Sequence, residues 1–269
     1  MNMFSFDRFF VGLFVSVGCI LIGLLIERRG PARPQGFGAT VFNIVYSVPA
    51  SFLQTLLLPT AAALTTFATT NATSGSLITL PANGWRLLPA LFVYIFAMDF
   101  GEYVFHRAQH RFPLLWSMHS LHHSDPAFNV STTIRHYWLE HFIKSVTVYL
   151  MVGIIFKVNP IVIALYSLIG FYNYFTHMNL NVGFGRWSVV INSPQYHRIH
   201  HSALAEHHDR NFAALFPVFD LVFGSYRQPR PAEFPATGLG SHEIPSGALE
   251  AILWPFRHWL HHLSHPQAR

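Results

Sequence analysis

Long hydrophobic runs separated by short polar segments make up most of the first two-thirds of the chain. The first run, Phe9–Ile26, has nearly the ~20 residues that a ~30 Å hydrocarbon core requires. It is followed by ERRGPARP rather than by a small-residue cleavage site, so it predicts an uncleaved transmembrane helix instead of a signal peptide. The second run, Thr40–Phe67, contains Pro49 and Pro59 and predicts a kinked helix long enough to span.

Three further runs follow: Trp85–Phe105, Phe142–Phe156 and Ile161–Phe175. The first of these predicts another spanning helix. The last two are short and are separated by Lys157-Val158-Asn159-Pro160, so they predict a hairpin that enters and leaves on one side of the membrane. The segment 69–84 is polar, small and uncharged, which is typical of a loop.

The C-terminal part has a different pattern. The stretch 228–247 is rich in Pro and Gly and predicts irregular structure. Residues 248–263 mix Trp, Phe and Leu with Arg and His, which is typical of a helix lying in the membrane interface. We therefore expect three parts: N-terminal membrane helices and a loop (1–84), a main domain (85–227) and a tail (228–269).

Composition supports a membrane protein. Hydrophobic residues make up 51% of the chain and charged residues 11%, against roughly 25% charged in an ordinary soluble domain. A single cysteine, Cys19, excludes a disulfide scaffold and a thiolate zinc site. The net charge of +5 is small, and no basic run points to nucleic acid. Histidine is the unusual residue, with 18 against 12 acidic residues.

Arginine placement predicts the orientation. Arg28, Arg29 and Arg33 follow the first hydrophobic run, and Arg107 and Arg111 follow the third, whereas the loop at 69–84 carries no charge. By the positive-inside rule the segment 27–39 and everything after the third run face the cytoplasm. We expect a multi-pass membrane protein with its histidine-rich segments on that side. The compact chain without an ER-retrieval tail favours a bacterial inner membrane over the endoplasmic reticulum.

Three histidine clusters carry the candidate chemistry. One is an HxxxH pattern at the end of the third run, and two are HxxHH patterns. On a helix, positions three and four apart share one side, so each HxxHH cluster can aim three imidazoles at one point. Imidazole is the commonest metal ligand. Eight ligands exceed the need of one centre and predict two metals with open positions: His106, His110, His119, His122, His123, His197, His200 and His201.

Other candidates are weaker. His177, at the end of the fifth run, faces the same side and is a further candidate ligand. Asp99 and Glu102 lie one or two turns before the HxxxH cluster, and charge near a membrane segment marks a functional candidate. We expect them to support the metal-bound histidines, with pairing to Arg107 or Arg111 as the alternative. Asp125, Glu140, Glu206 and Asp209 also lie near the clusters.

These residues resemble the sterol desaturase family within the fatty acid hydroxylase superfamily of integral-membrane di-iron oxygenases. The matching segments run in order from about residue 87 to 227: DFGEYVFHRAQH, WSMHSLHHS, RHYWLE, FTHMN, QYHRIHHS and the stretch ending FPVFDLVFGSY. The three histidine boxes together are highly specific. Two positions depart from related patterns: Tyr137 replaces a histidine of sterol-type members, and Asn173 replaces one of the fatty-acid hydroxylases.

The resemblance implies an all-α membrane protein with about four transmembrane helices under a cytosolic helical cap. It implies two irons held by the eight box histidines, with His177 as a ninth ligand; zinc can replace iron in a crystal because both accept imidazole. It also implies a lipid substrate, O2, and electrons from an external donor of the ferredoxin, cytochrome b5 or reductase type. The implied reaction is hydroxylation or desaturation of a C–H bond, and the spacing of the histidines does not distinguish the two.

Three alternatives remain at this stage. A metal transporter would place its ligands near the membrane midplane, whereas these clusters lie beyond the helix ends. A zinc hydrolase commonly uses three protein ligands, fewer than are present. A non-catalytic member of the family would not need the complete set of boxes.

Overall fold

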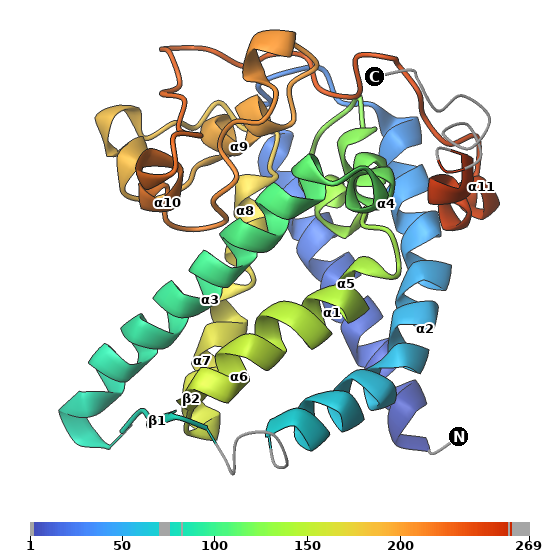
Figure 1. The fold of residues 1–269 in the computed structure, drawn as a ribbon. Coiled ribbons are helices and arrows are strands. Elements are labelled where there is room, and N and C mark those ends of the chain that lie inside the picture. The colour runs from blue at the N-terminus through green and yellow to red at the C-terminus, as the bar shows by residue number, and fades with distance from the viewer. Residues whose placement is uncertain (1–2, 70–75, 82, 258, 260–269) are drawn as a thin grey trace.

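The structure, a computed structural model, describes the chain except residues 1–2, 70–75, 82, 258 and 260–269. It has two layers (Figure 1). Long helices form one layer, and short helices and connecting segments form a cap over one end of it. The two-layer arrangement places the segments that contain the histidine clusters together in and under the cap.

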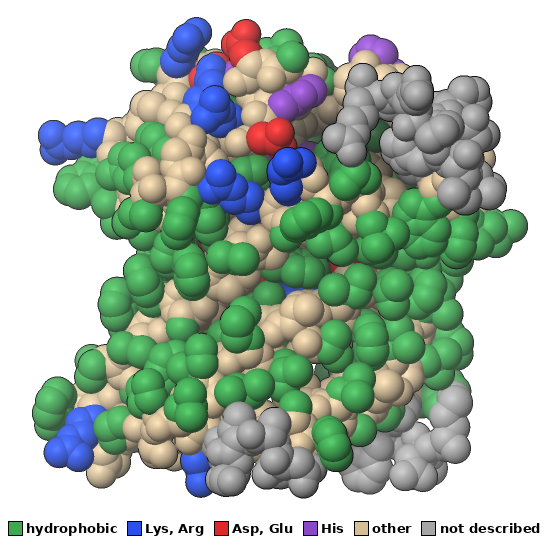
Figure 2. Space-filling model, viewed as in Figure 1, with side chains coloured by type: hydrophobic (Ala, Val, Ile, Leu, Met, Phe, Trp, Pro, Cys, Tyr) green, Lys and Arg blue, Asp and Glu red, His purple; other side chains and the backbone are tan. Residues whose placement is uncertain are grey.

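Three long helices form the frame of the first layer: α1 (Met3–Glu27), α2 (Phe37–Phe67) and α3 (Leu87–Arg111). Among the described residues these three are long and apolar enough to cross a membrane. Their outward side chains are large and apolar, such as Phe14 at 73% and Leu88 at 73% exposure. Figure 2 shows hydrophobic side chains over this layer and most of the visible Lys and Arg over the cap. The expected all-α membrane architecture is confirmed.

The fourth and fifth hydrophobic runs form the expected hairpin. One arm is built from α5 (Glu140–Lys144), a π-helical segment (Ser145–Tyr149) and α6 (Leu150–Ile155); the other from α7 (Pro160–Ile169) and α8 (Tyr172–Thr176). Between them β2 (Phe156–Lys157) pairs in parallel with β1 (Ile78–Thr79), just before α3 begins. The hairpin thus reaches the end of the molecule opposite the cap (Figure 1), but its arms are shorter than the three spanning helices.

The cap consists of short elements. Its helices are α4 (Pro113–His123), α9 (Pro194–His200), α10 (Val218–Val222) and α11 (Ala248–Ile252), with 3-10 segments at Val130–Ile134, Gly185–Val189 and Ala205–His207; a further 3-10 turn, Gly84–Arg86, leads into α3 at the opposite end of the molecule (Figure 1). Proline occupies the first turn of α4 and of α9, where its missing N–H costs nothing. In α9 the Ser193 side chain accepts the Tyr196 N–H and caps the helix.

A buried carboxylate joins the cap to the long helices. Glu27 ends α1 and is fully buried, and its Oε1 accepts the backbone N–H groups of Val130 and Asn179, each at 2.8 Å. These two residues are distant in sequence and belong to different cap segments. The end of α1 therefore holds two parts of the cap in position.

The tail differs from the predicted interfacial helix in its described part. Helix α11 is short, and the Trp254 that follows it is fully buried in a cluster with Tyr46, Leu121 and Tyr137. Its indole N–H donates to Ser120 Oγ at 2.9 Å. Ala251 and Trp254 thus pack into the protein core, whereas Leu249, Leu253 and Phe256 of the same segment remain 71%, 47% and 46% exposed. Residues 258 and 260–263 of the predicted helix lie outside the described residues.

Candidate metal centre

The structure brings the nine predicted histidines into two adjacent groups. The five-histidine group consists of His106, His110, His119, His123 and His200, and the four-histidine group of His122, His177, His197 and His201. Within each group the candidate ligand nitrogens lie within 4.8 Å of one another. Each of the two groups could hold a metal ion.

Each HxxHH motif is divided between the two groups, which corrects the expectation that its three imidazoles converge. From α4, His119 and His123 join the five-histidine group and His122 the four-histidine group. From α9, His197 and His201 join the four-histidine group and His200 the other. Around a helix, position i+4 lies about 40° from i in one direction, and position i+3 lies about 60° from i in the other direction. Helices α4 and α9 therefore each supply both groups.

Hydrogen bonds orient the rings of the five-histidine group. Nδ1 of His106 and of His200 each lie 2.8 Å from a backbone carbonyl oxygen, those of Phe212 and Arg210. Nδ1 of His119 lies 3.0 Å from Glu140 Oε2. Donation from Nδ1 leaves a lone pair on Nε2, and the Nε2 atoms of these three rings are buried with no hydrogen-bond partner in the described structure. A metal ion requires ring nitrogens of this kind: their lone pairs converge without hydrogen-bond partners, while the other nitrogen of each ring is held by a hydrogen bond.

The four-histidine group has the same character. His177 Nδ1 lies 2.7 Å from the Asn173 carbonyl oxygen, so its Nε2 presents a lone pair. That Nε2 is 3.0 Å from His197 Nε2 and 3.3 Å from His122 Nε2. His201 Nε2 is buried without a hydrogen-bond partner. Ring nitrogens that face one another so closely fit a shared cation, and this donor set of neutral imidazoles suits iron, zinc or copper.

Electrostatics keeps these rings neutral. Burial, reinforced by the neighbouring histidines, holds the pKa values of His122, His123 and His201 well below the usual range. Burial lowers the pKa of His177 to about 3. Neutral imidazole is the form that binds a metal, so the groups are prepared for metal at any pH near neutrality.

Asp99 and Glu102 do not contact the histidines in the way the sequence suggested, nor do they pair with Arg107 or Arg111. The two Asp99 oxygens accept the backbone N–H groups of Leu215 and Phe216 at 2.9 and 2.8 Å. Glu102 pairs with Lys144 at 2.7 Å. Both residues nevertheless line a cavity that reaches the histidines.

Other oxygens orient the rings. Among the carboxylates that lie near the clusters in sequence, Glu140 contacts His119, and Asp209 Oδ1 lies 3.3 Å from His110 Nδ1. The carbonyl groups of Asn173, Arg210 and Phe212 hold His177, His200 and His106. A backbone carbonyl has no residue-specific signature, so sequence reasoning had no signal for these three.

The remaining histidines are dispersed. His136 stacks on His122 with ring centroids 4.1 Å apart and, with His119 and Glu140, forms a third potential ligand group. His141 Nδ1 lies 3.4 Å from Gln54 Nε2, and His207 is buried beside Glu233. His208 and His242 are exposed. The histidines at 258, 261, 262 and 265 lie outside the described residues.

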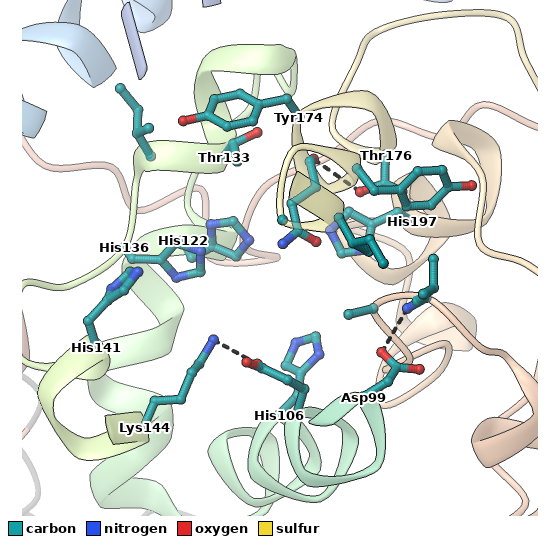
Figure 3. Close-up of a pocket in the computed structure, with 18 of the residues that line it drawn as sticks. Asp99, His106, His122, Thr133, His136, His141, Lys144, Tyr174, Thr176 and His197 are labelled. Carbon is teal, nitrogen blue, oxygen red and sulfur yellow. Dashed lines mark hydrogen bonds and ion pairs between the residues drawn. The ribbon is translucent and has the colours of Figure 1, made fainter. Parts of the chain in front are cut away.

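A cavity of about 370 Å³ lies against the two histidine groups, between the long helices and the hairpin. His106, His122 and His197 are among its lining residues (Figure 3). Other lining residues come from α2, α3, α5, α7 and α8. Its volume lies within the roughly 300–1,000 Å³ of ligand-binding pockets, and it is the natural place for a substrate.

Comparison with known proteins agrees with this geometry. The fatty acid hydroxylase family model matches residues 91–225, half of the chain. The chain is 30% identical over 130 residues to an alkylglycerol monooxygenase of Danio rerio, covering 48% of this chain and 28% of that protein. It is 24% identical over 174 residues to the ornithine lipid hydroxylase OlsE of Rhizobium tropici, covering 64% of this chain and 52% of that protein.

The human alkylglycerol monooxygenase is 29% identical over 130 residues, again 48% of this chain and 28% of the relative. The chain thus spans about a third or less of the alkylglycerol monooxygenases and about half of the ornithine lipid hydroxylase. No solved structure is significantly similar to it. The match covers every histidine of both groups, and the chain belongs to the fatty acid hydroxylase family.

Proposed function

We propose that this protein is a membrane-bound lipid hydroxylase that uses O2 at a centre of two irons held by the nine histidines. The observation that carries the proposal is the pair of histidine groups whose ring nitrogens either lack a hydrogen-bond partner or face one another, beside a cavity between apolar helices. The named relatives act on lipids as monooxygenases or hydroxylases, which supports the same reaction class here.

Iron, when bound, would supply the activation of O2 that an unactivated C–H bond requires. The chain's own residues supply position and dryness. Carbonyl and carboxylate oxygens hold the rings, and the buried cap keeps bulk water away from the reacting carbon. Hydroxylation converts a C–H bond and O2 into an alcohol and water, and it consumes two electrons and two protons. An external electron donor must therefore dock on the cap.

The proposal also includes the orientation in the membrane, the kind of membrane and the division of the chain into parts. We place the cap and its histidines on the cytoplasmic side of a bacterial inner membrane, because arginines flank the cap ends of α1 and α3. The parts 1–84, 85–227 and 228–269 stay predictions, with the family match lying inside the middle one. Desaturation would use the same cavity and centre.

Metal analysis of the purified full chain from iron-replete cells tests the proposal. We expect about two irons per chain. His200→Ala and His197→Ala, one from each group, should each lower the iron content and abolish lipid oxidation, whereas the exposed His242→Ala should change neither. Tightly bound zinc without iron, or full activity in His200→Ala, would contradict the proposed centre.

A further inference from the structure

An ion pair stands in the wall of the cavity next to the metal groups. Lys144 Nζ, from α5, lies 2.7 Å from Glu102 Oε2, from α3, and both residues line the cavity. Their side chains are 23% and 18% exposed. Figure 3 shows the Lys144 side chain pointing into the cavity, toward the part of the wall that carries His106.

Helix packing does not account for this pair. Where α3 meets the α5–α6 arm, Met98, Phe105 and Val148 already form an apolar cluster. Charged groups among membrane helices are costly and mark functional sites. An ion pair removed from water is often no more stabilising than apolar residues of the same size. The position of this ion pair is therefore better explained by the cavity that it faces than by a contribution to the packing of α3 against α5.

The pair has unused hydrogen-bonding capacity. An ammonium group has three donors and a carboxylate about four acceptor positions. Among the described residues, this ion pair is the only side-chain hydrogen bond or ion pair of Lys144 Nζ and of the Glu102 carboxylate. Gln54, His141 and Tyr166 line the same cavity. This part of the wall can both donate to and accept from a bound molecule.

The charges in the cavity wall limit the chemical class of ligand that fits there. A lone lysine would select an anion, but here the lysine is matched by a carboxylate at contact distance. The other cavity carboxylate, Asp99, is engaged by two backbone N–H groups. A neutral or zwitterionic group that carries both donors and acceptors fits this wall better than a phosphate or a bare hydrocarbon.

We propose that Lys144 and Glu102 bind the hydroxyl- or amine-bearing, net-neutral head group of the lipid substrate. Because the same cavity is lined by His106, His122 and His197, the oxidised carbon lies in or next to that head group rather than in the middle of an acyl chain. This inference rests on the proposed lipid hydroxylase function and deepens it.

A binding experiment tests the inference without turnover. The metal-loaded full chain in detergent is titrated with hexadecylglycerol and with its analogue methylated on both hydroxyls. Wild type should bind the free diol about tenfold more tightly, since charge-assisted hydrogen bonds are lost on methylation. Lys144→Met should bring the ratio close to one and leave affinity for the methylated lipid within about twofold.

The chain offers a matched control. Lys157, the only other lysine, is exposed on β2, and Lys157→Met should keep the tenfold ratio. If Lys144→Met does not fold, Glu102→Gln, which keeps the size of the side chain, reports on the same ratio. Equal binding of both lipids by wild type, or an equal loss for both in the variants, would overturn the inference.

Product analysis separates this inference from the proposed function. With the diol lipid and an electron donor, mass spectrometry should place the new oxygen on a head-group carbon or the first chain carbon. Oxygen in mid-chain, with no binding preference for the diol, would overturn the inference and leave the hydroxylase function standing. Binding preference without oxidation of either lipid would support the head-group site and contradict the hydroxylase.

Discussion

At the residue scale, one buried carboxylate anchors His119 of the five-histidine group. Glu140 accepts from His119 Nδ1 at 3.0 Å, from Gln109 Nε2 at 2.6 Å and from the Tyr137 backbone N–H at 3.0 Å. It belongs to α5, which also carries Lys144 of the proposed head-group site. The same short helix therefore contributes to the metal centre and to the cavity wall.

Glu140→Gln should weaken iron binding because the neutral amide is a poorer acceptor for His119 Nδ1. Loss of such a supporting contact typically lowers metal affinity about 10–100-fold. Iron retained against a competing chelator measures the effect, with the exposed Glu243→Gln as the control. Wild-type retention in Glu140→Gln would show that Glu140 does not orient the ligand.

A second residue-scale prediction concerns acid stability. Hydrogen bonds from Arg227, at 2.9 and 2.7 Å, lower the pKa of Glu233 to about 2. A carboxylate with a depressed pKa stabilises the folded state above its unfolded pKa, near 4.3, and loses that contribution as the pH falls toward 2.

Glu233→Gln should therefore lower the unfolding temperature at pH 6, and the difference from wild type should shrink between pH 4.5 and pH 3. Thermal unfolding followed by tryptophan fluorescence measures this. A difference that stays constant over that range would mean that the charge of Glu233 does not cause the effect.

At the scale of elements, α3 approaches the π-helical segment closely at one glycine. A Cβ on Gly101 would lie 2.7 Å from Val148 Cγ1. Gly101 precedes Glu102 on the helix that also carries His106 and His110. The missing side chain thus lets α3 and the hairpin arm come close enough for Glu102 and Lys144 to pair.

Gly101→Ala should destabilise the protein by about 1–3 kcal/mol through overpacking, and adding Val148→Ala should restore part of this loss. Gly12→Ala on α1 is the matched control, because among the described residues no atom apart from the neighbouring residues and the backbone of its own helix lies within 4 Å of the new Cβ. Thermal unfolding compares the three variants. No loss in Gly101→Ala, or no recovery in the double variant, would contradict the close contact.

At the scale of the whole molecule, segments from both the N-terminal and the C-terminal parts of the chain pack on the cap. Trp254, from the tail, is fully buried with Tyr46 of α2 and Leu121 of α4, the helix that carries three of the histidines. Glu27 of α1 binds two other cap segments. Packing from 1–84 and 228–269 thus supports the centre that lies in 85–227.

Trp254→Ala should cost about 3–5 kcal/mol, as expected for a buried tryptophan, and should release iron more readily because α4 loses support. Unfolding temperature and iron release measure the two effects. Trp187→Ala, at a tryptophan that is 60% exposed, should change little. Unchanged iron release in Trp254→Ala would show that the tail does not support the proposed metal centre.

The sequence by itself determined the membrane class, the positions of the long helices and the nine histidines. Hydrophobic length and ligand spacing are local properties, so α1, α2 and α3 and the clusters on α4 and α9 were readable from the chain. The family followed from the same boxes.

Only the tertiary structure decided how those histidines divide and what surrounds them. Each HxxHH motif contributes to both groups because α4 and α9 lie between them. The spacing of residues along one helix does not tell where another helix packs. The supporting carbonyls of Arg210 and Phe212, and the pairing of Glu102 with Lys144 instead of an arginine, depend on contacts between distant segments. Trp254 became a core residue for the same reason: burial depends on which surfaces the fold brings together, and an apolar side chain suits a membrane surface and a protein core equally well.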